Sequence, residues 1–321
     1  MKNPIDRRGF IKTALGAVAG VAVLPHSGRA ASWTENPVAT LAMPRRPLGK
    51  TGHPVCLFSL GGQSTLETPG TEEQSLAIIN RALDLGVNYV DTAAAYGNGI
   101  SETYIGRVMK IRRKEVYLAS KTHDRSYDGS LRLLERTLKN LQTDHLDAWQ
   151  LHHVGSQDDL DRIFAPNGAL KAMEKMRSQK VIRFLGITGH KDPAILATAI
   201  RQYEFDTILM ALNAADRHRK PFTEELLPLA VEKKMGIIGM KIPARGRIFR
   251  DGGITTMQQA MRYTLTLPVS TVIIGIDTLE HLEENIRIAQ SFTPLQSTEM
   301  AALEEKTKSY YESASWFKFR G

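Results

Sequence analysis

The chain has 321 residues, 42% of them hydrophobic, and a formal net charge of +8. This length can bury a large core and suits a single α/β barrel. Part of the positive charge is concentrated in the first 30 residues, so the charge of the remainder gives little support to a nucleic-acid-binding protein. The single cysteine, Cys56, excludes an intrachain disulfide and a Cys-x-x-Cys metal or iron–sulfur site.

The N-terminal segment, residues 1–31, reads as a twin-arginine signal peptide. Asp6–Lys12 contains the paired arginines, Ala14–Leu24 is a mildly apolar run, and small residues surround Ala30. The run is shorter than the ~20 apolar residues of a spanning helix, so we expect a cleaved signal and no stable membrane anchor. This predicts the twin-arginine export machinery as a partner and a periplasmic or otherwise exported location.

A polar linker at residues 32–42 precedes one predicted domain at residues 43–321. Arg45–Leu48 and Val55–Leu57 flank a glycine-bearing turn, which predicts an N-terminal β-hairpin. Its Gly-Lys-Thr sequence is not a phosphate-binding loop, because Pro44 stands where that motif needs its first glycine.

After the hairpin, apolar strand-like runs alternate with amphipathic helices. Strands are expected at Leu57–Leu60, Val87–Val90, Val116–Ser120, Leu146–Leu151, Phe184–Ile187, Thr207–Leu212, Ile237–Met240 and Val272–Ile276. Helices are expected at Glu72–Leu85, Ser101–Ile111, Ser130–Leu141, Ala169–Gln179, Pro193–Tyr203, Thr223–Lys234, Thr255–Leu267 and Leu279–Ala289.

Eight such units predict an α/β fold, a (β/α)8 TIM barrel. An open doubly wound sheet is disfavoured because no Gly-x-Gly-x-x-Gly follows the first strand. Thr298–Tyr311 is expected as an extra C-terminal helix outside the barrel, and Val154–Gly168 as a loop.

Ionisable residues stand at the ends of three successive strands. Asp91, Lys121 and His152 occupy these positions, and Tyr96 follows Asp91 on a loop that leads to Ser101, the expected N-cap of the next helix. In a barrel these strand ends meet on the C-terminal face. Asp91 alone could cap a helix and Lys121 alone could be solvated, but together they favour a catalytic site over a structural role.

The residue types at these strand ends suit proton transfer to a carbonyl oxygen. A tyrosine has an ordinary pKa of ~10, and a nearby Lys121 ammonium would lower the pKa of Tyr96. Asp91 would hold Lys121, His152 would orient the substrate oxygen, and Tyr96 would protonate it. Strand alternation points His153 away from His152. The histidines lack the His-Glu-x-x-His spacing of a zinc hydrolase, and no metal site is expected.

Together these segments resemble the aldo-keto reductase family. The matching pieces, in order, are Arg46–Gly52, Asp91–Glu102, Leu118–Lys121, Asp147–His152, Gly186–His190 and Leu282–Asn285. The resemblance implies a (β/α)8 fold, nicotinamide-dependent reduction of an aldehyde or ketone, and the catalytic tetrad Asp91, Tyr96, Lys121 and His152.

The resemblance also places a dinucleotide over the later strand ends. The implied cofactor-binding residues are Thr188, Gly189, Asn213, Met240, Lys241, Gly275, Asp277, Glu284 and Asn285. Many members have asparagine where Gly189 stands, and many have a basic residue where Asp277 stands. A carboxylate at Asp277 would repel the 2′-phosphate of NADPH, although Lys241 or Arg245 could supply positive charge. We expect NADPH on family grounds and keep NADH open.

The sequence is compatible with two functions. The first is an exported reductase of a small-molecule carbonyl compound, and the intact tetrad favours it. The second is a catalytically silent barrel that binds a nicotinamide nucleotide as a sensor or as a subunit of a complex. Free nicotinamide cofactor should be scarce outside the cytoplasm. An exported enzyme would therefore need to bind its cofactor tightly before translocation or have a partner that recycles it.

Overall fold

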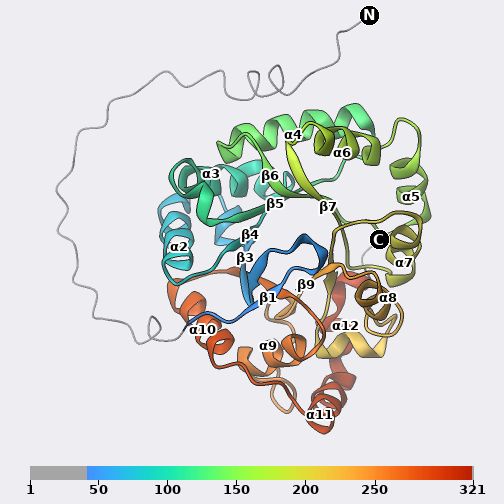
Figure 1. Cartoon of the computed structure of the whole chain (residues 1–321). Coiled ribbons are helices and arrows are strands. Elements are labelled where there is room, and N and C mark those ends of the chain that lie inside the picture. The colour runs from blue at the N-terminus through green and yellow to red at the C-terminus, as the bar shows by residue number, and fades with distance from the viewer. Residues whose placement is uncertain (1–41, 320–321) are drawn as a thin grey trace, which may run out of the picture.

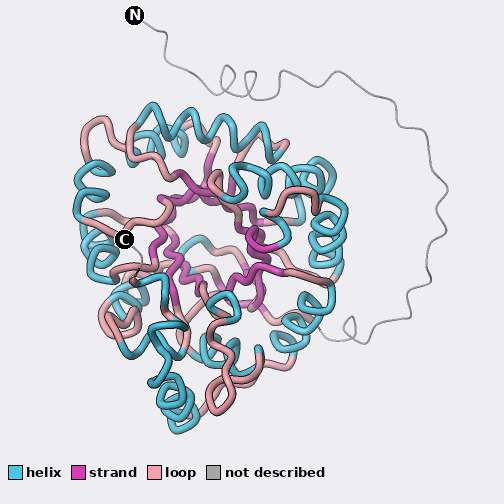
Figure 2. The backbone as a smooth tube through the Cα atoms, turned by 180° about the vertical axis from the view of Figure 1, so that it is seen from behind, coloured by secondary structure: helices cyan, strands magenta, loops and turns pink. Residues whose placement is uncertain are grey.

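The computed structural model describes residues 42–319 and contains one closed barrel of eight parallel strands (Figures 1 and 2). The predicted signal peptide and all of the linker except Ala42 lie outside the described residues. Around the barrel the strands follow chain order, with the last strand paired to the first. They are β3 Phe58–Ser64, β4 Tyr89–Asp91, β5 Tyr117–Thr122, β6 Leu146–Leu151, β7 Ile182–Gly189, β8 Thr207–Ala211, β9 Gly236–Met240 and β10 Thr271–Ile276. The predicted barrel and its eight strands are confirmed.

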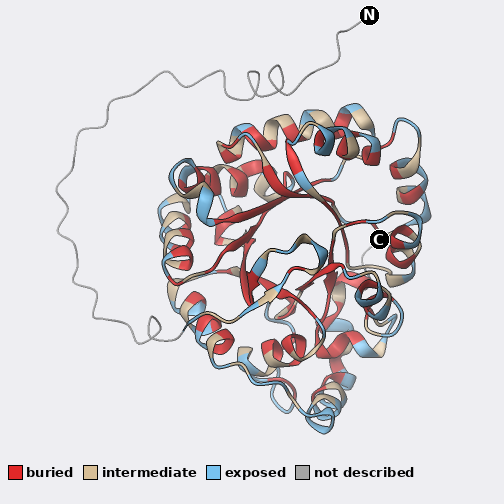
Figure 3. Cartoon of the chain, in the orientation of Figure 1, coloured by how far each residue is buried: buried red, intermediate tan, exposed pale blue. Residues whose placement is uncertain are grey.

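Helices surround the barrel, and those next to the strands bury one face against it, as the red inner faces in Figure 3 show. They are α2 Glu72–Asp84, α3 Ile100–Arg112, α4 Tyr127–Leu141, α5 Gln157–Phe164, α6 Ala169–Ser178, α7 Pro193–Gln202, α8 Leu226–Glu232, α9 Met257–Thr266, α10 Leu279–Gln290, α11 Ser297–Thr307 and α12 Tyr311–Ala314. The expected loop at Val154–Gly168 was wrong in part, because α5 lies within it. Ser156 is the N-cap of α5, and its side chain accepts a hydrogen bond from the Asp159 amide.

The predicted hairpin is present as β1, Arg45–Pro47, paired antiparallel with β2, Pro54–Cys56. It lies across the end of the barrel that faces the viewer in Figure 1. Leu48 and Val55 are fully buried in a cluster with inward-facing strand residues such as Tyr117. Gly49 has a φ of +49°, and a Cβ there would lie 2.2 Å from the backbone nitrogen of Gly236, so only glycine fits. The hairpin therefore closes the N-terminal end and leaves the other end for chemistry.

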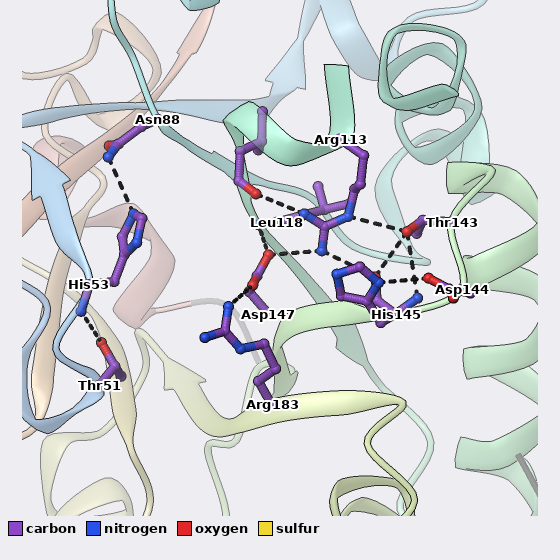
Figure 4. Close-up of polar contacts among 11 residues, drawn as sticks. Thr51, His53, Asn88, Arg113, Leu118, Thr143, Asp144, His145, Asp147 and Arg183 are labelled. Atoms are coloured by element: carbon purple, nitrogen blue, oxygen red, sulfur yellow. Dashed lines mark hydrogen bonds and ion pairs between the residues drawn. The ribbon is translucent and has the colours of Figure 1, made fainter. Parts of the chain in front are cut away.

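A buried ion network near the N-terminal ends of the strands lies at that closed end of the barrel (Figure 4). One Asp147 carboxylate oxygen accepts hydrogen bonds from the Arg113 guanidinium at 2.8 Å and the Leu118 amide at 2.9 Å. The other accepts from Arg183 at 2.8 Å. The network ties β5, β6 and β7 together where no site residue was predicted.

The C-terminal segment follows α10 with the extra helix that the sequence predicted, α11, which packs outside the barrel against α9. The chain then returns through α12 to the short helix Trp316–Lys318. There the buried Lys318 ammonium pairs with Asp216 and donates to the carbonyl oxygens of Arg219 and Lys220. This anchor returns the C-terminal aromatic residues to the C-terminal mouth of the barrel, against His190 and the loop after β9.

Among residues 42–319, no helix combines the length and apolar character that crossing a bilayer requires. The same residues hold no group of three or more His, Cys, Asp or Glu side chains arranged to bind a metal ion.

Candidate active site

A buried ion pair lies at the C-terminal end of β4 and β5. Lys121 is 1% exposed and Asp91 is fully buried, and the Lys121 ammonium donates to one Asp91 carboxylate oxygen. It also donates to the Thr92 carbonyl at 2.7 Å and to the Tyr96 hydroxyl at 3.4 Å. Three of the four predicted catalytic residues are therefore in direct contact.

The charges of this group follow from burial and pairing. Burial acts to lower the pKa of Lys121, but Asp91 and Tyr96 outweigh it and the pKa lies above its ordinary value. Burial raises the pKa of Asp91, and Lys121 only partly offsets it. The Lys121 side chain is thus held as an ammonium.

The pKa of Tyr96 departs from the sequence-based expectation. Lys121 acts in the expected direction and lowers it, but burial raises it more, so the pKa lies above the ordinary value. The expected net lowering was wrong because desolvation of the phenolate outweighs one nearby ammonium. The hydroxyl therefore stays protonated near neutral pH, as a proton donor must.

His152 follows β6 and stands edge-on to Tyr96, with ring centroids 5.6 Å apart. Burial, assisted by the positive charge of Lys121, holds the pKa of His152 well below its ordinary value. A neutral imidazole can donate one hydrogen bond to a substrate oxygen. His153 has a φ of +58° and its Nδ1 lies 2.9 Å from Nε2 of His190, so its ring is directed to β7.

Gln150 contacts the ion pair, although no role was predicted for it. Its amide nitrogen donates to the second Asp91 carboxylate oxygen at 2.9 Å. The signal was present in the sequence, because Gln150 and His152 are two residues apart and strand alternation places both on one face.

Two residues at the start of α3 hold the ends of β4 and β5. Ser101 was expected as the N-cap, but Gly99, with a φ of +96°, takes that position. The Ser101 hydroxyl instead lies 2.8 Å from that of Thr92. The buried Glu102 carboxylate accepts from the Ser120 hydroxyl at 2.7 Å, directly before Lys121 in the chain. The sequence does not reveal these long-range contacts.

A cavity of about 870 Å³ opens beside the ion pair and is lined by Asp91 and Tyr96. Six of the predicted cofactor-binding residues line it, and these are Met240, Lys241, Gly275, Asp277, Glu284 and Asn285. The segment Gly61–Thr65, at the end of β3, forms another part of its wall and was not predicted. The cavity thus joins the catalytic group to the strand ends at which the sequence placed a dinucleotide.

The other three predicted cofactor residues do not line this cavity. Thr188 is 2% exposed near the end of β7. A Cβ at Gly189 would lie 2.3 Å from the Val154 carbonyl oxygen, so the backbone here leaves no room for a side chain. Asn213 caps the short helix Ala214–His218, and its amide nitrogen donates to the Lys241 carbonyl at 3.0 Å.

The donor set of the cavity fits a dinucleotide. The amide nitrogen of Asn285 is buried and has no hydrogen-bond acceptor within residues 42–319, although the residue lines the cavity wall. A buried donor of this kind calls for a partner, and an adenine ring nitrogen supplies one. Gly61 and Gly275 also line the cavity, and a Cβ at Gly61 would lie 3.0 Å from the Gly275 amide nitrogen, so glycine there lets β3 and β10 pack closely.

Residues 57–251 match the family model described as the aldo/keto reductase family, and the chain belongs to that family. The aldo-keto reductase AKR11C1 from Bacillus halodurans (holo form) is similar with a TM-score of 0.70 at 25% identity, over 82% of this chain and 96% of that one.

Two curated relatives agree with this assignment. The uncharacterized oxidoreductase YqkF of Bacillus subtilis is 26% identical over 313 residues, which cover 83% of this chain and 97% of the relative. The aldo-keto reductase yakc [NADP(+)] of Schizosaccharomyces pombe is 30% identical over 162 residues, 46% of each chain. The chain is thus an oxidoreductase of a barrel family, and this supports the enzyme over the catalytically silent alternative.

Proposed function

We propose that this chain reduces an aldehyde or ketone with a hydride from a nicotinamide dinucleotide, and that Tyr96 donates the proton. The observation that carries the proposal is the contact of one ammonium, Lys121, with both the Asp91 carboxylate and the Tyr96 hydroxyl. A structural ion pair alone would not require a protonated phenol at the wall of a large cavity.

The four residues divide the work of protonating a substrate oxygen. A carbonyl oxygen placed between Tyr96 and His152 accepts hydrogen bonds from both, which fixes its position. As negative charge develops on that oxygen, the Tyr96 hydroxyl gives up its proton, and the Lys121 ammonium stabilises the phenolate that remains. Asp91 keeps Lys121 charged and in place. The bound dinucleotide supplies the hydride that the carbonyl carbon accepts.

The cofactor would lie along the cavity, with Asn285 and Glu284 toward the adenine and Met240 near the nicotinamide. NADPH is the first choice, supported by the NADP(+) in the name of the yakc relative. The exposed Asp277 at the cavity wall acts against a 2′-phosphate, so NADH is the competitor. Fluorescence titrations with both dinucleotides decide between them: tighter binding of NADPH supports this choice, and tighter binding of NADH overturns it.

A carbonyl substrate screen tests the proposed reaction. Aldehydes, ketones and open-chain sugars are offered with NADPH and with NADH, and oxidation of the dinucleotide is followed by absorbance. We expect turnover of at least one class in the wild type and its near-complete loss in Tyr96→Phe, which keeps the ring. Undiminished turnover in this variant would overturn the role of Tyr96.

We further propose export of the folded protein to the periplasm by the twin-arginine machinery. The support is the sequence Asp6–Lys12 with the apolar run and small residues that follow it. Cell fractionation of the wild type and an Arg7→Lys/Arg8→Lys variant tests this. Retention of the variant in the cytoplasm with export of the wild type is expected; equal distribution of the two would contradict it.

A further inference from the structure

The cavity wall carries an ammonium, that of Lys241, which no carboxylate of residues 42–319 pairs with directly. Lys241 follows Met240 at the end of β9 and takes a φ of +64°. Its side chain lines the cavity, and within residues 42–319 its nitrogen makes no hydrogen bond or ion pair. A partly buried charge without a counter-ion is costly, so the arrangement suits an anion supplied from outside the chain.

The backbone of Lys241 is held firmly. Its carbonyl oxygen accepts from the Asn213 amide nitrogen at 3.0 Å and from the Ala244 amide at 3.0 Å. The Lys241 ammonium lies 5.8 Å from the ring centroid of Trp316, on the returning C-terminal segment. The side chain is therefore presented from a fixed turn against an aromatic wall.

The carboxylate of Glu67 favours the charged form of Lys241 but is shared with other groups. Glu67 lies in the same cavity wall, but its carboxylate pairs with Arg245 at 3.6 Å and accepts from Gln63 at 3.3 Å. Arg247 adds a further cation 5.4 Å from the Trp316 ring. Two cations of the cavity wall, Lys241 and Arg245, thus share one carboxylate, that of Glu67.

The charge of Lys241 acts on His190 and His153. Burial lowers the pKa of His190 to about 3, and the positive charge of Lys241 contributes in the same direction. His190 contacts His153, whose ring centroid lies 6.4 Å from that of His152. Burial and Arg245 lower the pKa of Lys241 itself to about 8, so it remains mostly charged at neutral pH. Lys241 thus lines the same cavity as Tyr96, and its charge acts on the two histidines next to His152 in this chain of contacts.

We propose that Lys241 binds an anionic group of the substrate, so that this enzyme acts on carbonyl compounds that carry a carboxylate or a phosphate. The inference rests on the proposed function, because it assigns the substrate class of the same site. The same ammonium could meet the phosphates of the dinucleotide, which offer the same chemistry from another source. The test separates the two sources.

Matched pairs of compounds provide the test: 4-carboxybenzaldehyde and succinic semialdehyde, each compared with its methyl ester. The ratio of kcat/KM for acid over ester is measured with NADPH for the wild type, Lys241→Met and Lys241→Arg. Arg247→Met is the control, since Arg247 also contacts Trp316 but does not line the cavity. Dissociation constants of NADPH are measured for all four proteins by fluorescence.

We expect the wild type to prefer at least one acid over its ester by about tenfold, the size of one charge-assisted contact. Lys241→Met should bring the ratio to about one, whereas Lys241→Arg and Arg247→Met should keep most of it. An unchanged ratio in Lys241→Met overturns the proposal. An unchanged ratio together with about tenfold weaker binding of NADPH by Lys241→Met would show that Lys241 binds the phosphates of the dinucleotide.

Failure of the proposed function gives a different result. If the wild type turns over neither member of any pair, calorimetric titration of the acids and esters into the NADPH complex still measures the preference for charge. Tighter binding of an acid that depends on Lys241 supports the anion site, and equal binding of acid and ester overturns it.

Discussion

The barrel has two ion networks, one at each end, each centred on a buried aspartate. The network at the closed end joins strands, and the one at the open end includes the proposed catalytic residues. At the closed end, Asp147 receives two guanidinium groups and a backbone amide. At the open end, Asp91 receives one ammonium and the neutral amide of Gln150. Both aspartates are buried, but the numbers of positive charges around them differ.

This difference sets the pKa values in opposite directions. Burial acts to raise the pKa of both carboxyl groups. At Asp147 the cations and the Leu118 amide outweigh burial and the pKa falls below its ordinary value. At Asp91 burial wins and the pKa is raised. At the closed end the charge of Asp147 is fully paired and holds strands together, whereas Asp91 has one ammonium, Lys121, which it shares with the Tyr96 hydroxyl.

The largest effect is expected for Lys121→Met. The variant removes the charge that stabilises the Tyr96 phenolate, and general acid–base groups of this kind contribute about 10²–10⁴-fold. We expect kcat to fall by about 10³-fold with little change in NADPH affinity, measured by steady-state kinetics and fluorescence titration. A decrease below tenfold would show that Tyr96 needs no cation.

Asp147→Asn should affect stability and spare catalysis. It leaves the partly buried Arg113 guanidinium without its counter-ion, and breaking a buried pair costs about 3–5 kcal/mol. Urea unfolding should show a loss in the free energy of unfolding near ~3 kcal/mol, with kcat within about twofold of the wild type. Loss of activity without loss of stability would contradict the structural role.

The two aspartates should also differ in the pH dependence of stability. The contribution of Asp147 is fully present above the unfolded pKa, ~3.9, and is lost as pH falls through its lower folded-state pKa. The contribution of Asp91 is present below the unfolded pKa and is lost as pH rises through its raised folded-state pKa. Unfolding of wild type, Asp147→Asn and Asp91→Asn from about pH 3 to 7 measures both. Slopes of the same sign would contradict the comparison.

The smallest expected effect is the difference in stability loss between substitutions of the two arginines that pair with Asp147. The Arg183 side chain is 60% exposed and the Arg113 side chain 15%. An exposed ion pair contributes about 0.2–1 kcal/mol, so Arg183→Gln should cost less than ~1 kcal/mol and Arg113→Gln more. Equal losses in urea unfolding would show that exposure does not weaken this pair.

The sequence predicted the barrel and brought the tetrad to one face, because strand periodicity places successive strand ends together. It could not predict how many charges surround each buried carboxyl group. Strand alternation could place Gln150 on the same face as His152, but its contact with Asp91, like that of Glu102 with Ser120, joins distant segments that no spacing encodes. The sign of the pKa shift at Tyr96 failed for the same reason, since desolvation depends on the packed interior.

A single-turnover measurement on Tyr96→Phe tests most directly whether Tyr96 donates the proton. The NADPH complex of wild type and variant is mixed with a substrate found in the screen, and dinucleotide oxidation is followed in a stopped-flow instrument. We expect a rate about 10³-fold lower in the variant, with NADPH affinity within about twofold. An unchanged single-turnover rate would contradict this expectation and would remove Tyr96 from the chemistry.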